Sequence, residues 1–143
     1  MPLANVIESA HQPQRTSNVQ SDLTAQLARH PRLCRLLSHL ESNPSLQLTT
    51  ASAAKIVCFQ ENYFCALFKR ETGRTFSSWQ RAWRVTKIST VLLSESITIA
   101  RAAERYGYLN MRTFERAFKA HFQTSAREYR RNQGWQPHSY RSE

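Results

Sequence analysis

The chain has 143 residues, of which 41% are apolar and 10% aromatic, and its formal net charge at pH 7 is +10. This length and composition support one ordinary hydrophobic core or two small ones, and they exclude a fibrous or wholly disordered chain. No apolar run approaches the roughly 20 residues of a membrane span, and the first thirty residues lack a secretory signal pattern, so we expect a cytoplasmic protein with no membrane partner.

The amino-terminal part is predicted to be a flexible arm over residues 1–30, because His, Gln, Pro, Ser and Asn mix there without sustained periodicity. A short helix near the end of this arm would place Leu23 and Leu27 on one side. Pro31 suits the first turn of the next helix, where its missing N–H would be unpaired in any case. Leucines then recur at i, i+3, i+4 and i+7, which predicts an amphipathic helix. They are Leu33, Leu36, Leu37 and Leu40.

Residues 49–73 are predicted to form two helices joined by a tight turn. Thr49 is a suitable N-cap for the first helix, and the turn falls at Cys58. The second helix ends at Gly73, a residue that adopts positive φ readily. The buried stripe of this second helix consists of Phe64, Leu67 and Phe68. Such a segment has the pattern of a helix-turn-helix unit.

A longer helix is predicted over residues 77–93; at about 1.5 Å per residue it would be near 25 Å long. Its core candidates are Trp79, Trp83, Ile88, Val91 and Leu92. A second two-helix unit follows over residues 98–122, with Thr98 as the N-cap of its first helix and Gly107 in the turn. The predicted core of its second helix consists of Phe114, Ala117, Phe118 and Phe122.

The two units share one buried helix face, because the motif F-x-x-x-F-K begins at Phe64 and again at Phe114, fifty residues later. Ser125 and Glu128 have the spacing of a capping box, which predicts a short last helix, and residues 132–143 are predicted to be a loose tail. We therefore predict an all-α fold of about seven helices. A long linker helix joins two helix-turn-helix subdomains within residues 31–131.

The positive charge coincides with this repeat. Residues 45–131 contain 15 Lys and Arg against 6 Asp and Glu, whereas residues 1–44 contain 4 against 3. Such a concentration of charge favours a polyanion, and the release of counterions from DNA supplies affinity that is independent of sequence. Charge alone leaves a solvated basic surface as an equally good interpretation.

From about Leu33 to Arg131 the chain resembles the DNA-binding domain of the AraC/XylS family of bacterial transcription regulators. In the first unit and the linker the matching residues are Ala54, Phe59, Phe64, the run from Phe68 to Gly73, Phe76, Trp79, Arg84, Val91 and Leu92. In the second unit they are Ile99, Ala100, Ala103, Gly107, Tyr108, Phe114, Phe118, Lys119, Phe122 and the run from Glu128 to Arg130. The chain departs from the family pattern at Cys58, Gln60, Gln123 and Ala126, of which Cys58 and Gln123 replace frequent glycines.

The resemblance implies that the second helix of each unit enters the major groove of DNA. Arg112 and Arg116 are predicted to contact guanine, Glu115 cytosine or an arginine, and Asn62 adenine. The full set of predicted base-reading residues is Arg112, Arg116, Glu115, Asn62, Met111, Cys65 and Ala66. We expect the second unit to dominate sequence recognition. The alternatives are phosphate contact or a solvated surface for the arginines, and helix capping for Asn62.

Basic residues around these helices are predicted to contact backbone phosphates, which fixes register without recognising sequence. They are Lys69, Arg70, Arg74, Arg81, Lys119, Arg130 and Arg131. Solvation is the alternative for each of them. Arg84, in the linker helix, could brace the two units instead of contacting DNA. If the two recognition helices stand closer together than successive major grooves, about 34 Å apart, the DNA must bend.

No catalytic or metal-binding constellation is evident, because the five histidines are scattered and the three cysteines lack ligand spacing. We therefore predict no enzyme activity, cofactor or metal. Only about 30 residues precede the matched region, so the resemblance is greatest to stand-alone family members, although a remnant of a longer regulator is an open alternative. By this resemblance we expect the protein to be a monomeric transcription activator that is located at the nucleoid. We also expect it to contact RNA polymerase and a protein co-regulator. The rival hypotheses are a repressor and a protein-interaction module of the same fold.

Overall fold

The structure, a computed structural model, describes residues 23–133, and within this range every regular element is a helix. Residues 23–28 are helical, and seven further helices follow. These are α3 (Pro31–Ser42), α4 (Thr50–Ile56), α5 (Glu61–Thr72), α6 (Phe76–Ser94), α7 (Ile99–Arg105), α8 (Met111–Phe122) and α9 (Ala126–Asn132). The predicted all-α class is confirmed. No helix in this range is long and apolar enough to cross a bilayer.

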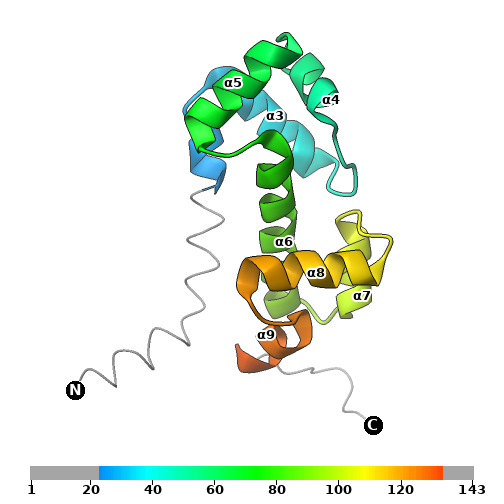
Figure 1. Cartoon of the computed structure of the whole chain (residues 1–143). Helices are drawn as coiled ribbons and strands as arrows, with labels where there is room; N and C mark the ends of the chain where they lie inside the picture. The colour runs from blue at the N-terminus through cyan, green and yellow to red at the C-terminus, as the bar shows by residue number, and fades with distance from the viewer. Residues whose placement is uncertain (1–22, 134–143) are drawn as a thin grey trace, which may run out of the picture.

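Helix α6 stands between two groups of helices (Figure 1). Its first half packs into a core with residues 23–28, α3, α4 and α5, while its second half packs into a separate core with α7, α8 and α9. Trp79 and Trp83 lie fully in the first core, with stacked rings whose centroids are 6.2 Å apart. Val85 and Ile88 lie in the second core. One continuous helix therefore contributes to both subdomains.

The first core begins earlier in the chain than predicted. Leu23 and Leu27 are only 3% and 0% exposed to solvent, and they belong to the same hydrophobic cluster as the leucines of α3. The prediction of a flexible arm up to residue 30 is therefore wrong for its last eight residues, which are part of the folded domain. Residues 1–22 and most of the predicted tail, 134–143, lie outside the described residues.

Helix starts in the two units follow the predicted capping chemistry. The Thr49 hydroxyl accepts a hydrogen bond from the Ser52 N–H at 3.1 Å, and the Thr98 hydroxyl accepts one from the Arg101 N–H at 3.1 Å. Each bond satisfies a backbone donor that has no partner within its own helix. These two helix starts could therefore be predicted from residues within the first turn.

The predicted capping box at α9 is only half correct. Ser125 Oγ accepts from the Glu128 N–H at 3.1 Å, as expected. The Glu128 carboxylate, however, accepts a 3.0 Å hydrogen bond from the Thr124 hydroxyl. The Glu128 carboxylate thus bonds the Thr124 hydroxyl, whereas in a complete capping box it would accept from the Ser125 N–H.

Candidate nucleic-acid interface

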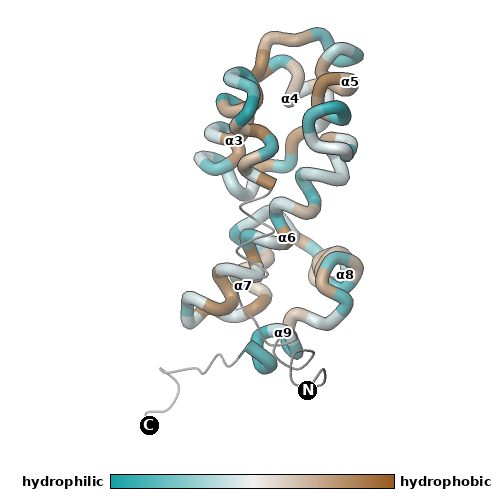
Figure 2. The backbone as a smooth tube through the Cα atoms, turned by 90° about the vertical axis from the view of Figure 1, so that its left-hand side faces the viewer, coloured by the Kyte–Doolittle hydropathy of each residue, from teal (hydrophilic) through white to brown (hydrophobic). Residues whose placement is uncertain are grey.

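Helices α5 and α8 each bury one face and expose the other. Phe64 and Phe68 of α5, and Phe114 and Phe118 of α8, are all 0% exposed. Within each pair the two ring centroids are 5.5 and 5.6 Å apart, a separation at which aromatic rings attract each other. In the side view of Figure 2, α5 and α8 lie on the same side of α6, and α3 and α7 lie on the other. The exposed faces of the two repeated helices are therefore available on one side of the molecule.

The exposed face of α8 carries the predicted readers of the second unit. Arg112, Glu115 and Arg116 are exposed, and Met111, at the first position of the helix, is 37% exposed. Asn110 is the N-cap: its side-chain oxygen accepts from the Arg112 N–H at 2.8 Å and from the Thr113 N–H at 3.2 Å. Asn110 therefore holds the start of the helix while the arginine side chains project from it.

The exposed face of α5 is chemically different. Asn62, Cys65 and Ala66 are exposed, so the structure brings together the predicted readers of the first unit on one face. Gln60 is the N-cap of α5 and its side chain makes no capping hydrogen bond. Asn62 caps no helix among residues 23–133, which removes the alternative of a capping role. Its carboxamide is available for contact with a partner.

Six of the seven predicted phosphate contacts lie at the surface. These exposed residues are Lys69, Arg70, Arg74, Arg81, Lys119 and Arg131. Arg70 pairs with Glu71, with Nε and Oε2 separated by 3.7 Å, yet 69% of the Arg70 side chain is exposed. Such a surface pair is weak and leaves the guanidinium free to approach a phosphate.

Arg130 is the exception and corrects the prediction. It is only 7% exposed, and its Nη2 donates a 2.8 Å hydrogen bond to the backbone carbonyl of Glu95, the C-cap of α6. The side chain thereby ties α9 to the end of α6. Arg130 therefore connects two helices of the second subdomain and is too buried to contact a phosphate as predicted.

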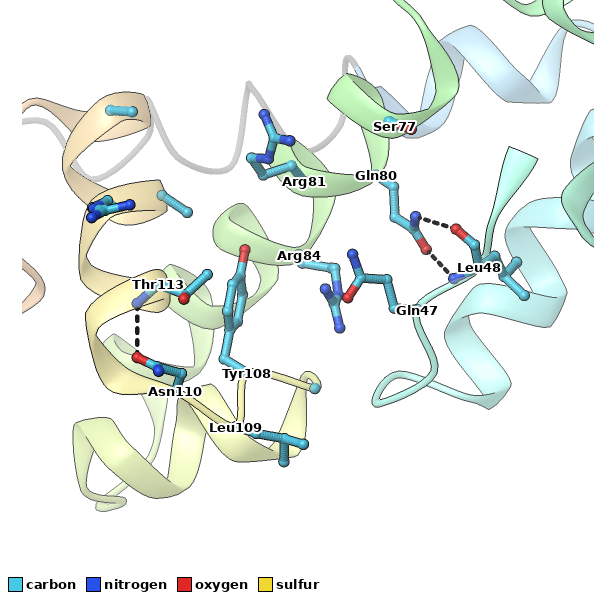
Figure 3. A pocket seen from close by; sticks show the side chains of 14 residues that line it. Gln47, Leu48, Ser77, Gln80, Arg81, Arg84, Tyr108, Leu109, Asn110 and Thr113 are labelled. Carbon is cyan, nitrogen blue, oxygen red and sulfur yellow. Dashed lines mark hydrogen bonds between the residues drawn. The ribbon is translucent and has the colours of Figure 1, made fainter. Parts of the chain in front are cut away.

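A cleft of about 700 Å³ lies between the two subdomains and is bounded by α6, α8, the turn before α8 and the loop before α4 (Figure 3). Arg81 and Arg116 line it and are exposed. A smaller pocket of about 130 Å³ brings Arg74, Arg81 and His121 together. The basic side chains of the candidate interface thus continue from α8 onto the linker helix.

Arg84 lines the same cleft but is only 3% exposed. Its guanidinium carbon lies 5.0 Å from the centroid of the Tyr108 ring, a cation–π contact between the linker helix and the second turn. Burial lowers the pKa of Arg84 and raises that of Tyr108, because both charged forms lose solvation. This contact joins the linker helix to the turn of the second unit, and the bracing of both units by Arg84 stays a prediction.

Gln80 was not singled out by sequence, although it lies one turn before Arg84. Its carboxamide oxygen accepts from the Leu48 N–H and its amide nitrogen donates to the Leu48 carbonyl, both at 3.0 Å. Gln80 is buried at 4% exposure, in the lining of the cleft. Arg84, Thr86 and Ser89 are also buried polar residues of α6, so the sequence offered no signal that distinguishes Gln80.

Two units that expose one face of their second helix on the same side of a shared helix define a tandem helix-turn-helix protein with a basic surface. A family model described as a helix-turn-helix domain matches residues 53–132. The chain is 34% identical over 101 residues to the transposon Tn10 TetD protein of Escherichia coli, covering 71% of this chain and 73% of that protein. It is 27% identical over 95 residues to the multiple antibiotic resistance protein MarA of E. coli K12, covering 66% and 75%.

Solved structures with the same fold include DNA-binding domains of the AraC type. The C-terminal domain of AraT, a response regulator from Geobacillus stearothermophilus, superposes with a TM-score of 0.66 at 28% identity, covering 80% of this chain and 93% of that one. An AraC-type transcriptional regulator from Chromobacterium violaceum gives a TM-score of 0.67 at 24% identity, covering 73% and 93%. The chain therefore belongs to the AraC/XylS family of DNA-binding transcription regulators, which are not enzymes. The family predicted from the sequence is confirmed.

Proposed function

We propose that this protein is a sequence-specific regulator that inserts α5 and α8 into successive major grooves of double-stranded DNA, with α8 supplying most of the base recognition. The observation that carries the proposal is the exposed face of α8, where Arg112 and Arg116 lie one turn apart. Each guanidinium can donate two hydrogen bonds to the O6 and N7 atoms of one guanine. Glu115 can accept from cytosine or orient a neighbouring arginine.

Helix α5 contributes fewer contacts in this proposal. Asn62 pairs with adenine through its carboxamide, and Cys65 and Ala66 approach thymine methyl groups. The six exposed basic residues position the protein on the phosphates, and Met111 packs at the edge of the groove. Arg81, an exposed residue of the linker helix, contacts the DNA backbone between the two grooves in this proposal. If the helices stand closer than 34 Å, the DNA bends to meet both.

The proposal extends to regulation. The chain acts as a monomer at the nucleoid of the cytoplasm and activates transcription by contacting RNA polymerase, with a protein co-regulator where its activity is controlled. A regulatory role is supported by the similarity to the C-terminal domain of AraT, a response regulator, at 28% identity. Transcription of a bound promoter by purified polymerase, with and without the protein, distinguishes activation from repression.

The decisive experiment maps the bound genomic sites for the wild type and for the double variant Arg112→Ala/Arg116→Ala. The matched control is Arg35→Ala/Arg127→Ala, which removes the same charge from exposed positions on α3 and α9. Loss of two bidentate contacts costs about 2–6 kcal/mol of discrimination, so the first variant should lose its specific sites while the control keeps them.

Retention of site-specific occupancy by Arg112→Ala/Arg116→Ala would refute the assignment of α8 as the main recognition helix. Retention of regulation without any specific DNA occupancy would favour the rival hypothesis, a protein-interaction module. For that hypothesis, Tyr63 of α5 is 54% exposed and offers an aromatic side chain to a protein partner.

A further inference from the structure

Four residues between 23 and 133 have positive φ, and they form two equivalent pairs. Cys58, at φ 61°, and Gly107, at φ 90°, each lie in the turn of a unit, four residues after a buried alanine. Gly73, at φ 76°, and Gln123, at φ 61°, are the C-caps of α5 and α8. The turn position is a cysteine in the first unit, and the C-cap position is a glutamine in the second unit. Positive φ alone therefore does not require glycine at the turn or at the C-cap.

The surroundings of the two glycines are different. A Cβ atom placed on Gly73 would have no neighbour within 4 Å. A Cβ atom on Gly107 would collide with the Arg84 guanidinium and would lie 2.5 Å from the backbone carbonyl oxygen of Ser45. Gly107 is therefore the point where the backbone of the second unit meets the loop that precedes α4 in the first unit.

Helix α6 holds both sides of this contact. Through Gln80 it hydrogen-bonds both backbone groups of Leu48, three residues after Ser45. Through Arg84, one turn later, it packs on the Tyr108 ring, next to Gly107. Figure 3 shows these side chains converging on the cleft from α6, the loop and the turn. The loop of one unit and the turn of the other are thereby held against the same side of one helix.

We propose that the contact of Gly107 with Ser45 and Arg84 sets the separation of the recognition helices α5 and α8, and with it the spacing between half-sites that the protein accepts on DNA. Gly107 is a positioning residue in this proposal, which rests on the proposed insertion of both helices. Helix α8 begins four residues after Gly107 and is capped by Asn110, so displacement of the turn moves the start of the helix with it. Because the Ser45 atom is backbone, the contact cannot be relieved by a side-chain rotation.

The test compares Gly107→Ala with Gly73→Ala. Both substitutions place alanine at positive φ and carry the same kind of backbone strain, but only the first meets atoms of the other unit. Distances between the helices are measured by electron-spin resonance on labels at Cys65 and at Glu115→Cys, equivalent exposed positions of α5 and α8, with Cys34 and Cys58 replaced. We expect a longer distance in Gly107→Ala and an unchanged distance in Gly73→Ala.

The DNA measurement uses one bound site and copies of it with one or two base pairs added or removed between the half-sites. Overpacking of this kind should reduce the affinity of Gly107→Ala for the original spacing about tenfold, with recovery on a changed spacing. Gly73→Ala should keep the wild-type preference. Equal distances and equal spacing preferences for Gly107→Ala and the wild type would overturn the proposal, even if the variant were less stable.

The variant Arg84→Lys tests the same contact if Gly107→Ala does not fold, because it removes the planar group from Tyr108 and leaves Gly107 unchanged. We expect a broader distance distribution and weaker discrimination between spacings; wild-type values for both would overturn the proposal. A wild-type protein that binds specific sites but is insensitive to spacing would refute two-helix insertion itself. The label distances, which are measured without DNA, still test the positioning contact in that case.

Discussion

Substitution of Gln80 by methionine should destabilise the protein strongly, although Gln80 belongs to no recognition helix. Methionine has a similar length and an unbranched chain, so it fills the same space with little cavity. It cannot, however, replace the two 3.0 Å hydrogen bonds to the backbone N–H and carbonyl of Leu48. Those two groups lie in a residue that is only 9% exposed, and they would lose their partners.

Each buried backbone group left without a partner costs about 1–3 kcal/mol. Partial access of water to Leu48 moves the sum toward the lower half of the range, and we expect Gln80→Met to lower the free energy of unfolding by about 2–4 kcal/mol. Total stabilities of small domains are about 5–15 kcal/mol, so a loss of this size is a large fraction of the whole.

Urea denaturation followed by circular dichroism measures the change, with the free energy extrapolated linearly to zero denaturant. The matched control is Gln47→Met, the same substitution at an exposed glutamine that lines the same cleft. It should change the free energy by less than about 0.5 kcal/mol, as is usual for surface positions. A Gln80→Met protein as stable as Gln47→Met would refute the view that this pair of hydrogen bonds holds the first unit to α6.

Cys58→Gly should raise the free energy of unfolding by about 0.5–1 kcal/mol, since relief of the left-handed strain exceeds the extra entropy of unfolded glycine; an unchanged or lower melting temperature would contradict it. Arg130→Ala should cost about 1–3 kcal/mol of stability and leave the salt dependence of DNA binding unchanged, whereas Arg131→Ala should reduce the salt slope by about 1 at constant stability; the reverse pattern would restore Arg130 to the phosphate contacts. Burial, assisted by the charge of Arg74, lowers the pKa of His121 in the folded state. As the pH falls, His121 is therefore protonated at a higher pH in the unfolded chain than in the folded one. Stability should therefore be highest above about pH 6.5 and fall as the pH drops below it, and His121→Gln should flatten this part of the urea-derived pH profile.

Helices, their starts and their buried faces could be predicted from the sequence because they depend on neighbours three or four residues away. Phe64 and Phe68 mark one buried stripe and Phe114 and Phe118 the other, and the exposed positions follow from the helical period. The same period placed Arg112 and Arg116 on one exposed face. Because these features depend on nearby residues, the recurrence of the F-x-x-x-F-K motif after fifty residues was enough to indicate two similar units. The residues around the motif indicated their family.

Arg130 shows where local reasoning failed. Its position beside Arg131 in a short basic helix gave no indication that its partner is the carbonyl of Glu95, 35 residues earlier in the chain. The helix at residues 23–28 was expected as a short helix with Leu23 and Leu27 on one side, but its place in the first core was not, because these leucines are buried only by helices that follow them. Burial of a short segment depends on what packs against it, which the segment itself does not encode.

By itself the sequence determined the all-α class, the tandem units and the chemical difference between the exposed faces of the two second helices. The tertiary structure alone decided how those units are held with respect to each other. Gln80 meets Leu48 across 32 residues, and Gly107 meets Ser45 across a greater separation. Such contacts have no period along the chain, because they form only when α6 brings a loop of one subdomain against a turn of the other.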